Sequence, residues 1–544
     1  MSRARGWLVV ALLATVGCRD DEGGEGDGGG SARAGLSEAE LLTRASLDLR
    51  GVRPSVDELE AVRREPARVD AMIEGFVDDP AFGERMKDVF AGAWRTRIDL
   101  YRLPELGYAG EYDDPRHAAI GEEPLQLVAY IALNDLPFTH LLRSTETFVD
   151  PVQLDTWPLE PVEGPAGERL PEGTVRARYV DGRPLAGVLS MNAVFWRHSS
   201  TVENANRGRA NALSQALLCQ SYLDRPIDFP TDLDLTDSES IRNAIATNPA
   251  CQGCHSTLDP LASYLWGYMY PDSDLPEPTY AVDQERAWQI NTGARPGYFG
   301  QPGERLVDLA EHVAGDERFV SCTVRRVYEG MLGRKAALED EGALAEHREA
   351  FLDGGLTLRA LVRSILHDPS YRGEPWTPRF GGSPQPVHEK VAPVGVLSRS
   401  LATLSGYELR LAGRPGTELD LALRRLAGGS DRGDTTNVST GAVLVQRRLA
   451  EAGASHAVLA AQEGRAAGGT LDGFLGGVDL GQAPTAEQLA QLVRIVRSRR
   501  LAADDPEIVA LVGVWDDVAA ISDPPQAWIA VLTAVLADPD HLLY

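Results

Sequence analysis

Apolar side chains recur at helical spacing over much of the chain, beginning near residue 36. Residues three or four positions apart on a helix share one face, so each such stripe predicts a helix that buries one side. Ser37 with Glu40, and Ser55 with Glu58, have the spacing of capping boxes, which begin helices. Two stripes lie in this part of the chain: Leu59, Val62, Val69, Ile73, Phe76 and Val77, and then Phe82, Met86, Val89, Phe90, Ala93 and Trp94. We therefore predict a small helical unit over residues 36–100.

Similar patterns predict helices through most of the remaining chain, separated by long segments rich in proline and glycine. The predicted helices cover about residues 123–134, 140–145, 212–219, 238–248, 319–332, 336–352 and 356–367 and most of 396–544. The segments 101–121, 150–180 and 271–302 are predicted to be loops. Pro124 would lie in the first turn of its helix, where proline is tolerated. The predicted fold class is mostly α and multidomain, with long Pro/Gly-rich loops.

Three of the predicted helices end with one short pattern. Asp79-Pro80, Asp368-Pro369 and Asp538-Pro539 each follow an apolar helix, and each precedes, after one further residue, an aromatic or histidine ring. Proline disfavours the helical conformation at the residue before it, so Asp-Pro ends the helix and lets the ring fold back onto the core. We interpret the pattern as a helix-end signal rather than a catalytic motif.

The first 18 residues have the pattern of an export signal. Arg3 and Arg5 supply positive charge, Trp7 to Val16 form an apolar stretch too short to span a bilayer, and Cys18 closes the segment. The segment resembles a bacterial lipoprotein signal, in which the cysteine is acylated. That resemblance implies a lipid anchor at Cys18 in the bacterial cell envelope, in the periplasm or at the outer membrane. An ordinary secretory signal is the alternative, and either signal exports the chain.

Charge narrows the range of partners. The chain has 80 acidic and 53 basic residues, a net charge of −27, which argues against nucleic acid as a partner. No later stretch is long and apolar enough to cross a membrane, so the lipid anchor is the only membrane contact that we expect. Composition divides the chain into an export signal (1–18), an acidic Gly-rich tether (19–35), an N-terminal helical part (36–150), a central domain (180–300), a helical domain (301–372), a linker (373–395) and a C-terminal helical domain (396–544).

The central domain contains the pentad Cys251-Gln252-Gly253-Cys254-His255. Cys and His are rare in this chain, with 5 and 10 of 544 residues. The spacing C-x-x-C-H is that of a c-type haem attachment site, in which both thiols form thioethers and the histidine binds the iron. Three alternatives stay open: a redox dithiol, half of a zinc site, or cysteines of structural disulfides. Pro249 ends the preceding helix, so the pentad opens a new segment.

The remaining cysteines depend on which alternative holds. With Cys18 set aside, and the central pair assigned to haem, Cys219 and Cys322 remain as an even pair that could form one disulfide. Without haem, four cysteines allow three pairings, and the sequence does not choose among them. A zinc site made of thiolates fits an oxidising compartment poorly.

Several segments together resemble the planctomycete-type multidomain cytochrome c proteins, which also occur in myxobacteria and whose domains are of unknown function. The similar segments are Arg44 to Pro54, Glu123 to Thr139, Gly187 to Cys219 with the pentad and Asp259-Pro260, and Cys322 to Arg372. The resemblance implies a mostly helical, exported, haem c-like protein and implies no reaction. Leu261-Ala262 stands where such proteins commonly have a glycine after Asp-Pro.

If haem is bound, His255 is the proximal ligand of its iron, and the opposite position has several candidate ligands. His198 lies in a segment covered by the resemblance, Met269 is close to the pentad in sequence, and Met191 is a weaker third. An empty sixth position is a further alternative. The aromatic run 264–270 either borders the haem or packs in the core.

These observations favour an electron-transfer lipoprotein, or the haem subunit of an exported oxidoreductase, with a redox protein as partner. No nucleophile elbow, His-Glu-x-x-His, phosphate-binding loop or dinucleotide fingerprint is present in context. A haem-free, disulfide-stapled scaffold or binding protein at the cell surface is the alternative from another class. An enzyme with catalytic groups in its helical domains, and with haem as its electron outlet, is a third hypothesis.

Overall fold

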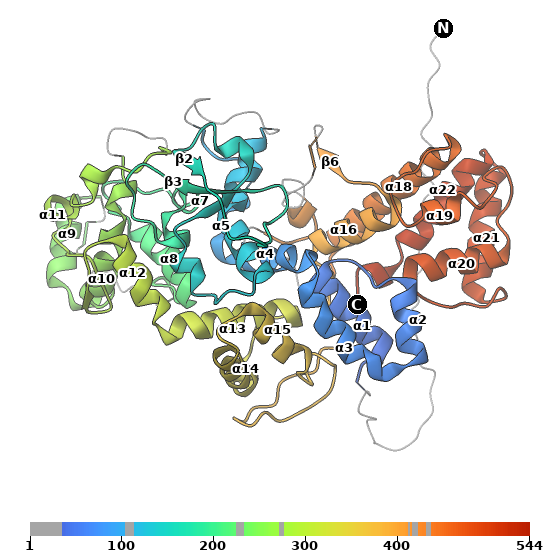
Figure 1. Ribbon diagram of the computed structural model, residues 1–544, viewed down its shortest axis with the longest axis horizontal. Helices are drawn as coiled ribbons and strands as arrows, with labels where there is room; N and C mark the ends of the chain where they lie inside the picture. The colour runs from blue at the N-terminus through green and yellow to red at the C-terminus, as the bar shows by residue number, and fades with distance from the viewer. Residues whose placement is uncertain are drawn as a thin grey trace, which may run out of the picture. The chain divides into compact units, whose positions relative to one another are not determined.

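The computed structural model describes residues 35–98, 100–103, 114–224, 233–234, 236–270, 277–411, 414–415, 423–430 and 437–544 (Figure 1). The predicted export signal, its Cys18 and all of the tether but residue 35 lie outside these ranges. Within them, helices form most of the regular structure and the strands form only small sheets. The predicted fold class, mostly α and multidomain, is confirmed. None of the helices in these ranges combines the length and apolar character that a bilayer-spanning helix needs.

The first helices begin where the local signals place them. They are α1 (Glu38–Arg50), α2 (Val56–Arg64), α3 (Val69–Gly75) and α4 (Ala81–Trp94). Both predicted capping boxes form: Ser37 caps α1 with Glu40, and Ser55 caps α2 with Glu58. The apolar stripes of these helices are buried in one hydrophobic cluster. Local sequence therefore determines this part of the fold.

The predicted Asp-Pro helix ends are also confirmed. A short 3₁₀ turn after α3 ends before Asp79, α15 (Leu358–Leu366) ends before Asp368, and α22 (Pro524–Leu536) ends before Asp538. The rings that follow these sites, Phe82, Tyr371 and His541, are all buried.

The long helix α5 corrects two predictions. It spans Pro115–Leu133, so residues 115–121 are helical rather than loop, and Pro124 lies in the helix interior rather than in its first turn. The start signal is Asp114-Pro115, because Asp114 accepts a hydrogen bond from the Arg116 amide at 3.0 Å and Pro115 occupies the first helical position. The prediction gave this role to Pro124, nine residues further on in a helix whose other side chains are almost all buried.

A three-stranded antiparallel sheet replaces part of the predicted loop 150–180. Its strands are β1 (Thr147–Val149), β2 (Leu159–Pro161) and β3 (Val175–Tyr179), in the order β1-β3-β2. Phe148 pairs with Arg176, and Glu160 pairs with Arg178. Trp157, Leu159, Ala177 and Tyr179 form a small buried cluster with Val149 and Trp196. Val175, Ala177 and Tyr179 alternate with two arginines in β3, which is a strand signal that the loop prediction did not use.

Nine further helices and one hairpin lie between residues 140 and 353 of the described chain. They are α6 (His140–Arg143), α7 (Asn192–Arg197), α8 (Arg207–Leu218), α9 (Ser238–Thr247), α10 (Pro249–Ala262), α11 (Trp288–Asn291), α12 (Leu306–Ala314), α13 (Glu317–Leu332) and α14 (Glu341–Asp353), with a hairpin of β4 (Gly297–Tyr298) and β5 (Gln301–Pro302). Helix α10 packs against α8 and α9. The predicted loop 271–302 thus contains α11 and this hairpin.

The C-terminal part has its own hydrophobic cluster, formed by residues between Ala392 and Leu542. Its elements are α16 (Val394–Ser405), β6 (Arg410–Leu411), β7 (Arg414–Pro415), α18 (Thr440–Gln462), α19 (Asp472–Leu475), α20 (Ala486–Arg497), α21 (Pro506–Ala519) and α22. The larger cluster is formed by residues between Leu41 and Val387. The domain boundaries given above remain predictions.

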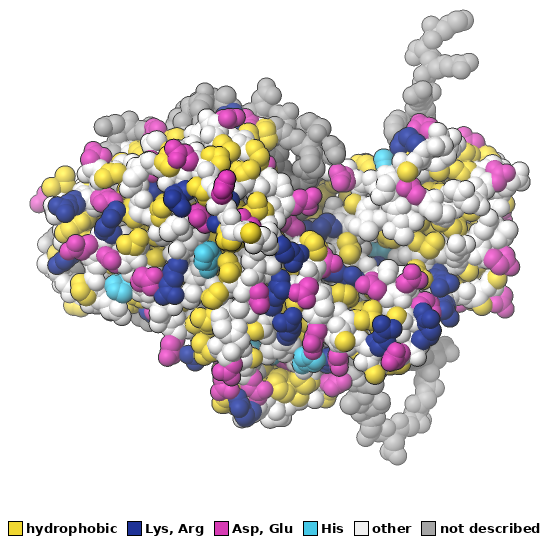
Figure 2. Space-filling model, viewed as in Figure 1, with side chains coloured by type: hydrophobic (Ala, Val, Ile, Leu, Met, Phe, Trp, Pro, Cys, Tyr) yellow, Lys and Arg dark blue, Asp and Glu magenta, His cyan; other side chains and the backbone are white. Residues whose placement is uncertain are grey.

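Charged side chains of both signs are interspersed on the face shown in Figure 2. The excess of acidic residues is therefore not gathered into one patch on this face.

Candidate functional site

The pentad occupies the first turns of α10. Helix α9 ends at Thr247, Asn248 caps α10 by accepting a hydrogen bond from the Ala250 amide at 2.8 Å, and Pro249 is the first helical residue. Proline is favoured at this position because its missing N–H would have no partner within the helix. The predicted break before the cysteines is confirmed, and it is only one residue long.

Helical geometry brings the three reactive side chains of the pentad together. Cys254 and His255 follow Cys251 by three and four positions, and residues at these spacings lie on the same face of a helix. All three side chains are partly buried, whereas Gln252 and Gly253 between them are exposed. Cys251 and Cys254 are both free thiols. The arrangement is one face of α10 with two thiols and one imidazole.

The imidazole of His255 is held by a carboxylate on its own helix. Its Nδ1 lies 2.9 Å from Oδ1 of Asp259, one turn further on. Arg207, the first residue of α8, holds the same carboxylate with Nε at 2.7 Å from Oδ1 and Nη2 at 3.0 Å from Oδ2. Burial by itself raises the pKa of Asp259, but the hydrogen bonds from His255 and Arg207 outweigh burial, so its pKa lies below the ordinary value.

Two residues along α8, Arg209 makes a separate network. Its Nε donates to the carbonyl of His198 at 2.7 Å, and its Nη1 donates to the carbonyl of Tyr268 at 2.8 Å and to Oδ1 of Asn206 at 2.9 Å. Its Nη2 donates to the carbonyl of Phe195 at 3.3 Å. Arg209 thereby ties the end of α7 and the aromatic run to the start of α8.

The three side chains considered for the opposite axial position contact residues outside the pentad. His198 Nε2 lies 3.3 Å from the carbonyl of Trp94, and burial, with further lowering by nearby arginines, brings the pKa of His198 to about 4. Met269 is buried in a small cluster with Ala205 and Trp266, and Met191 belongs to the large core cluster.

The aromatic run after α10 packs in the protein core. Tyr268 stacks on Phe195 with ring centroids 3.5 Å apart and meets Tyr280 edge-on. Trp266 and Tyr264 are also buried. Of the two interpretations offered for this run, the described contacts are those of a packing segment.

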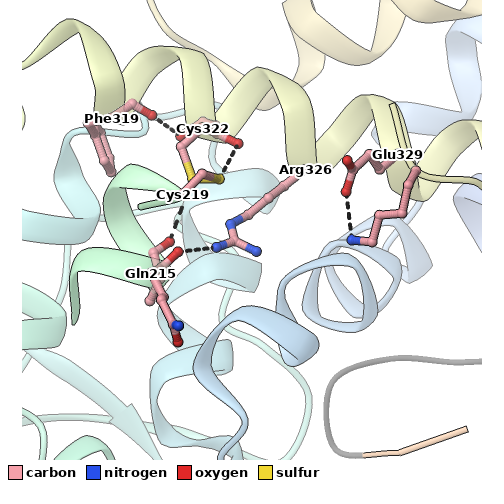
Figure 3. Close-up of a disulfide and its surroundings, with 9 residues drawn as sticks. Gln215, Cys219, Phe319, Cys322, Arg326 and Glu329 are labelled. Carbon is pink, nitrogen blue, oxygen red and sulfur yellow. Dashed lines mark hydrogen bonds and ion pairs between the residues drawn. A yellow bond between two sulfur atoms is a disulfide. The ribbon is translucent and has the colours of Figure 1, made fainter. Parts of the chain in front are cut away.

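A disulfide joins Cys219, directly after α8, to Cys322 on α13 (Figure 3). The two cysteines are 103 residues apart in sequence. Arg326 on α13 also donates a hydrogen bond to the carbonyl of Gln215 on α8. Cys219 and Cys322 are the two cysteines that the sequence left for a disulfide when Cys251 and Cys254 are assigned to haem. Helix α8 is therefore fixed at its end by the disulfide and bonded at its start to the carboxylate beside His255.

The pentad supplies the donor groups that a covalent haem would need. Covalent attachment needs two reduced thiols, and iron binding needs an imidazole nitrogen that is not already hydrogen-bonded. The pentad has two free thiols, and among the described contacts only Nδ1 of His255 is hydrogen-bonded. A zinc site needs further ligands beside the two thiols. In the part of the chain that the structure describes, no group of three or more His, Cys, Asp or Glu side chains is placed to hold a metal ion.

The sequence predicted no role at this site for Asp259 or Arg207. The spacing of four between His255 and Asp259 was a usable signal, because residues four positions apart lie on the same face of a helix such as α10. Arg207 lies 52 residues from Asp259, and no local pattern links the two.

Comparison with known families finds one match. Residues 185–269 match the family model PSCyt3, described as a protein of unknown function (DUF1588). The matched segment includes the pentad, Asp259 and Arg207, so the predicted resemblance to planctomycete-type domains is confirmed for this segment. The resemblances of the other segments remain predictions. Searches of curated proteins and of solved structures find no match to the chain.

Proposed function

We propose that the chain is an exported electron-transfer protein that binds one covalent haem c on α10. The observation that carries the proposal is the shared face of Cys251, Cys254 and His255, with both thiols free and Nδ1 of the histidine already hydrogen-bonded. When bound, a haem supplies one-electron chemistry between its ferric and ferrous states.

The residues of the pentad have distinct roles in this proposal. Cys251 and Cys254 would hold the haem as thioethers, which form by addition of each S–H across a vinyl double bond and so require reduced thiols but no oxidant. His255 would bind the iron through Nε2, because Nδ1 is held by Asp259.

The proposed setting is the bacterial cell envelope, with a lipid anchor at Cys18 and a redox protein as the partner that gives or takes the electron. The Cys219–Cys322 disulfide supports export, since disulfides persist mainly in oxidising compartments. The export pattern of residues 1–18 points the same way.

The disulfide also favours the second candidate function. It clamps α8 to α13 without help from the pentad, as a stapled scaffold or binding protein would require. In that case the chain would bind no haem, and Cys251 and Cys254 would stay free thiols.

A haem stain and a pyridine haemochrome spectrum on the full chain separate the two candidates. The protein is produced in a host with c-type haem maturation, together with Cys251→Ala/Cys254→Ala and the matched control Cys219→Ala/Cys322→Ala. We expect covalent haem in the wild type and in the control, and none in the pentad variant. Wild-type protein without covalent haem would contradict the cytochrome proposal and leave the stapled scaffold.

A further inference from the structure

We propose that Asp259 and Arg207 are positioning residues that set the reduction potential of the haem iron through His255, and that they act in opposite directions. This inference rests on the proposed function. It adds two residues outside the C-x-x-C-H pattern, one on α10 and one on α8.

The first step concerns the tautomer of His255. An ionised carboxylate only accepts hydrogen bonds, and the contact between Nδ1 of His255 and Oδ1 of Asp259 is 2.9 Å. In the neutral imidazole Nδ1 must therefore carry the proton, which leaves the lone pair on Nε2. Within the described residues no hydrogen-bond partner contacts Nε2, so Asp259 selects the nitrogen that can bind iron.

The second step concerns the electron density on the ring. A carboxylate that accepts from the far nitrogen of a metal-bound imidazole raises the basicity of the ligand. A more basic ligand stabilises the ferric state and lowers the reduction potential. Asp259 is only 8 % exposed, so water screens this interaction little.

The third step concerns Arg207. Its guanidinium forms two hydrogen bonds to the Asp259 carboxylate, at 2.7 and 3.0 Å, and so neutralises part of its charge. A cation near the iron also disfavours the ferric state. Arg207 therefore raises the potential that Asp259 lowers.

The position of Arg207 at the start of α8 indicates that its pairing with Asp259 is specific. It is the first residue of α8, where the helix dipole disfavours a cation. Its side chain is 21 % exposed and pairs with Asp259 across 52 residues of sequence. The ion pair with Asp259 offsets the unfavourable interaction between the Arg207 charge and the dipole of α8.

Potentiometric titration of the haem-loaded full chain tests the proposal. The variants are Asp259→Asn, which keeps an acceptor oxygen but removes the charge, and Arg207→Gln, with the exposed Ser256→Ala as matched control. At the wild-type midpoint, we expect Asp259→Asn to shift the ratio of reduced to oxidised haem at least tenfold toward reduced, which is about 59 mV for one electron. We expect Arg207→Gln to shift it toward oxidised, and the control to leave it unchanged.

The opposite signs separate electronic tuning from a general loosening of the site, which would move both variants the same way. Covalent haem in the wild type with potentials that do not move, or that move in the same direction, overturns this inference and leaves the proposed function intact. Absence of covalent haem from the wild type overturns the proposed function and this inference with it. A ¹⁵N-histidine spectrum of the haem-free chain adds a second readout, and a His255 protonated at Nε2 rather than Nδ1 also overturns the inference.

Discussion

The hydroxyl of Tyr544 donates a hydrogen bond to Oδ1 of Asp48 at 2.7 Å, although the two residues are 496 positions apart. Tyr371 donates to the other carboxylate oxygen at 2.8 Å, and the ammonium group of Lys390 pairs with Oδ1. Asp48 is 3 % exposed, and burial lowers the pKa of Lys390 to about 8. One buried carboxylate on α1 thus bonds to side chains from three distant segments.

Substitution Asp48→Ala should destabilise the chain strongly. Removing one partner of a buried ion pair leaves the other charge uncompensated, which typically costs about 3–5 kcal/mol. Urea unfolding followed by far-UV circular dichroism measures the change. Asp353→Asn, at the exposed end of α14, is the matched control and should change the free energy of unfolding by less than about 0.5 kcal/mol. A similar small change for Asp48→Ala would show that the network contributes little.

Loss of the Cys219–Cys322 disulfide should destabilise the chain. A crosslink that closes a loop of 103 residues restricts the unfolded chain, and removing a native disulfide commonly costs about 2–5 kcal/mol. We expect Cys219→Ala/Cys322→Ala to lower the free energy of unfolding by this amount. Reduction of the wild type with dithiothreitol should reproduce the effect, and the double variant should not respond to it. A response of the double variant would place the relevant bond elsewhere.

Glu123 on α5 should make stability fall as pH rises. Its carboxyl is fully buried and accepts hydrogen bonds from Tyr179 Oη at 2.7 Å, Thr147 Oγ1 at 3.2 Å and the Ala193 amide at 3.1 Å. Burial raises the pKa of Glu123 from 4.5 to about 7. Between these values the folded chain keeps the proton that the unfolded chain has lost. The contribution to stability is therefore complete below about pH 4.5 and lost as pH rises through about 7.

The variant Glu123→Gln should lack this dependence. Unfolding curves at several pH values give the free-energy difference between wild type and variant. We expect that difference to move in favour of the variant by roughly 1.4 kcal/mol per pH unit across the window. Glu163→Gln changes an exposed glutamate, and its free energy of unfolding should depend on pH as that of the wild type does. If the free energy of unfolding of Glu123→Gln also follows the wild type at every pH, then Glu123 ionises normally in the folded chain.

Replacement of Arg209 by methionine should cost more than about 3 kcal/mol. Three buried acceptors, the carbonyls of Phe195 and Tyr268 and the side chain of Asn206, and the partly buried carbonyl of His198 would lose their donor. Unsatisfied buried groups cost about 1–3 kcal/mol each. Arg448→Met is the control, because the Arg448 side chain is 80 % exposed. Equal thermal unfolding midpoints for the two variants would contradict the role assigned to Arg209.

Predictions from sequence were accurate where the signal was local. The capping boxes at Ser37 and Ser55, the Asp-Pro helix ends and the break before Cys251 each depend on residues within about one turn of helix. The α5 boundary failed because two prolines, Pro115 and Pro124, compete as start signals in one segment. The strand β3 was missed because its alternating run of five residues is short and lies in a segment rich in Pro and Gly, and the three residues of β2 are too few to show a period.

The sequence alone determined the helical class, and it placed two thiols and one imidazole three and four residues apart, a spacing that any helix brings onto one face. Only the tertiary structure brought Arg207 to Asp259, joined Cys219 to Cys322, and set His198 and Met269 among other partners. These contacts depend on how helices distant in sequence pack, since many packings bury the same apolar stripes. Among these packings, the side-chain hydrogen bonds and the disulfide favour the one that forms.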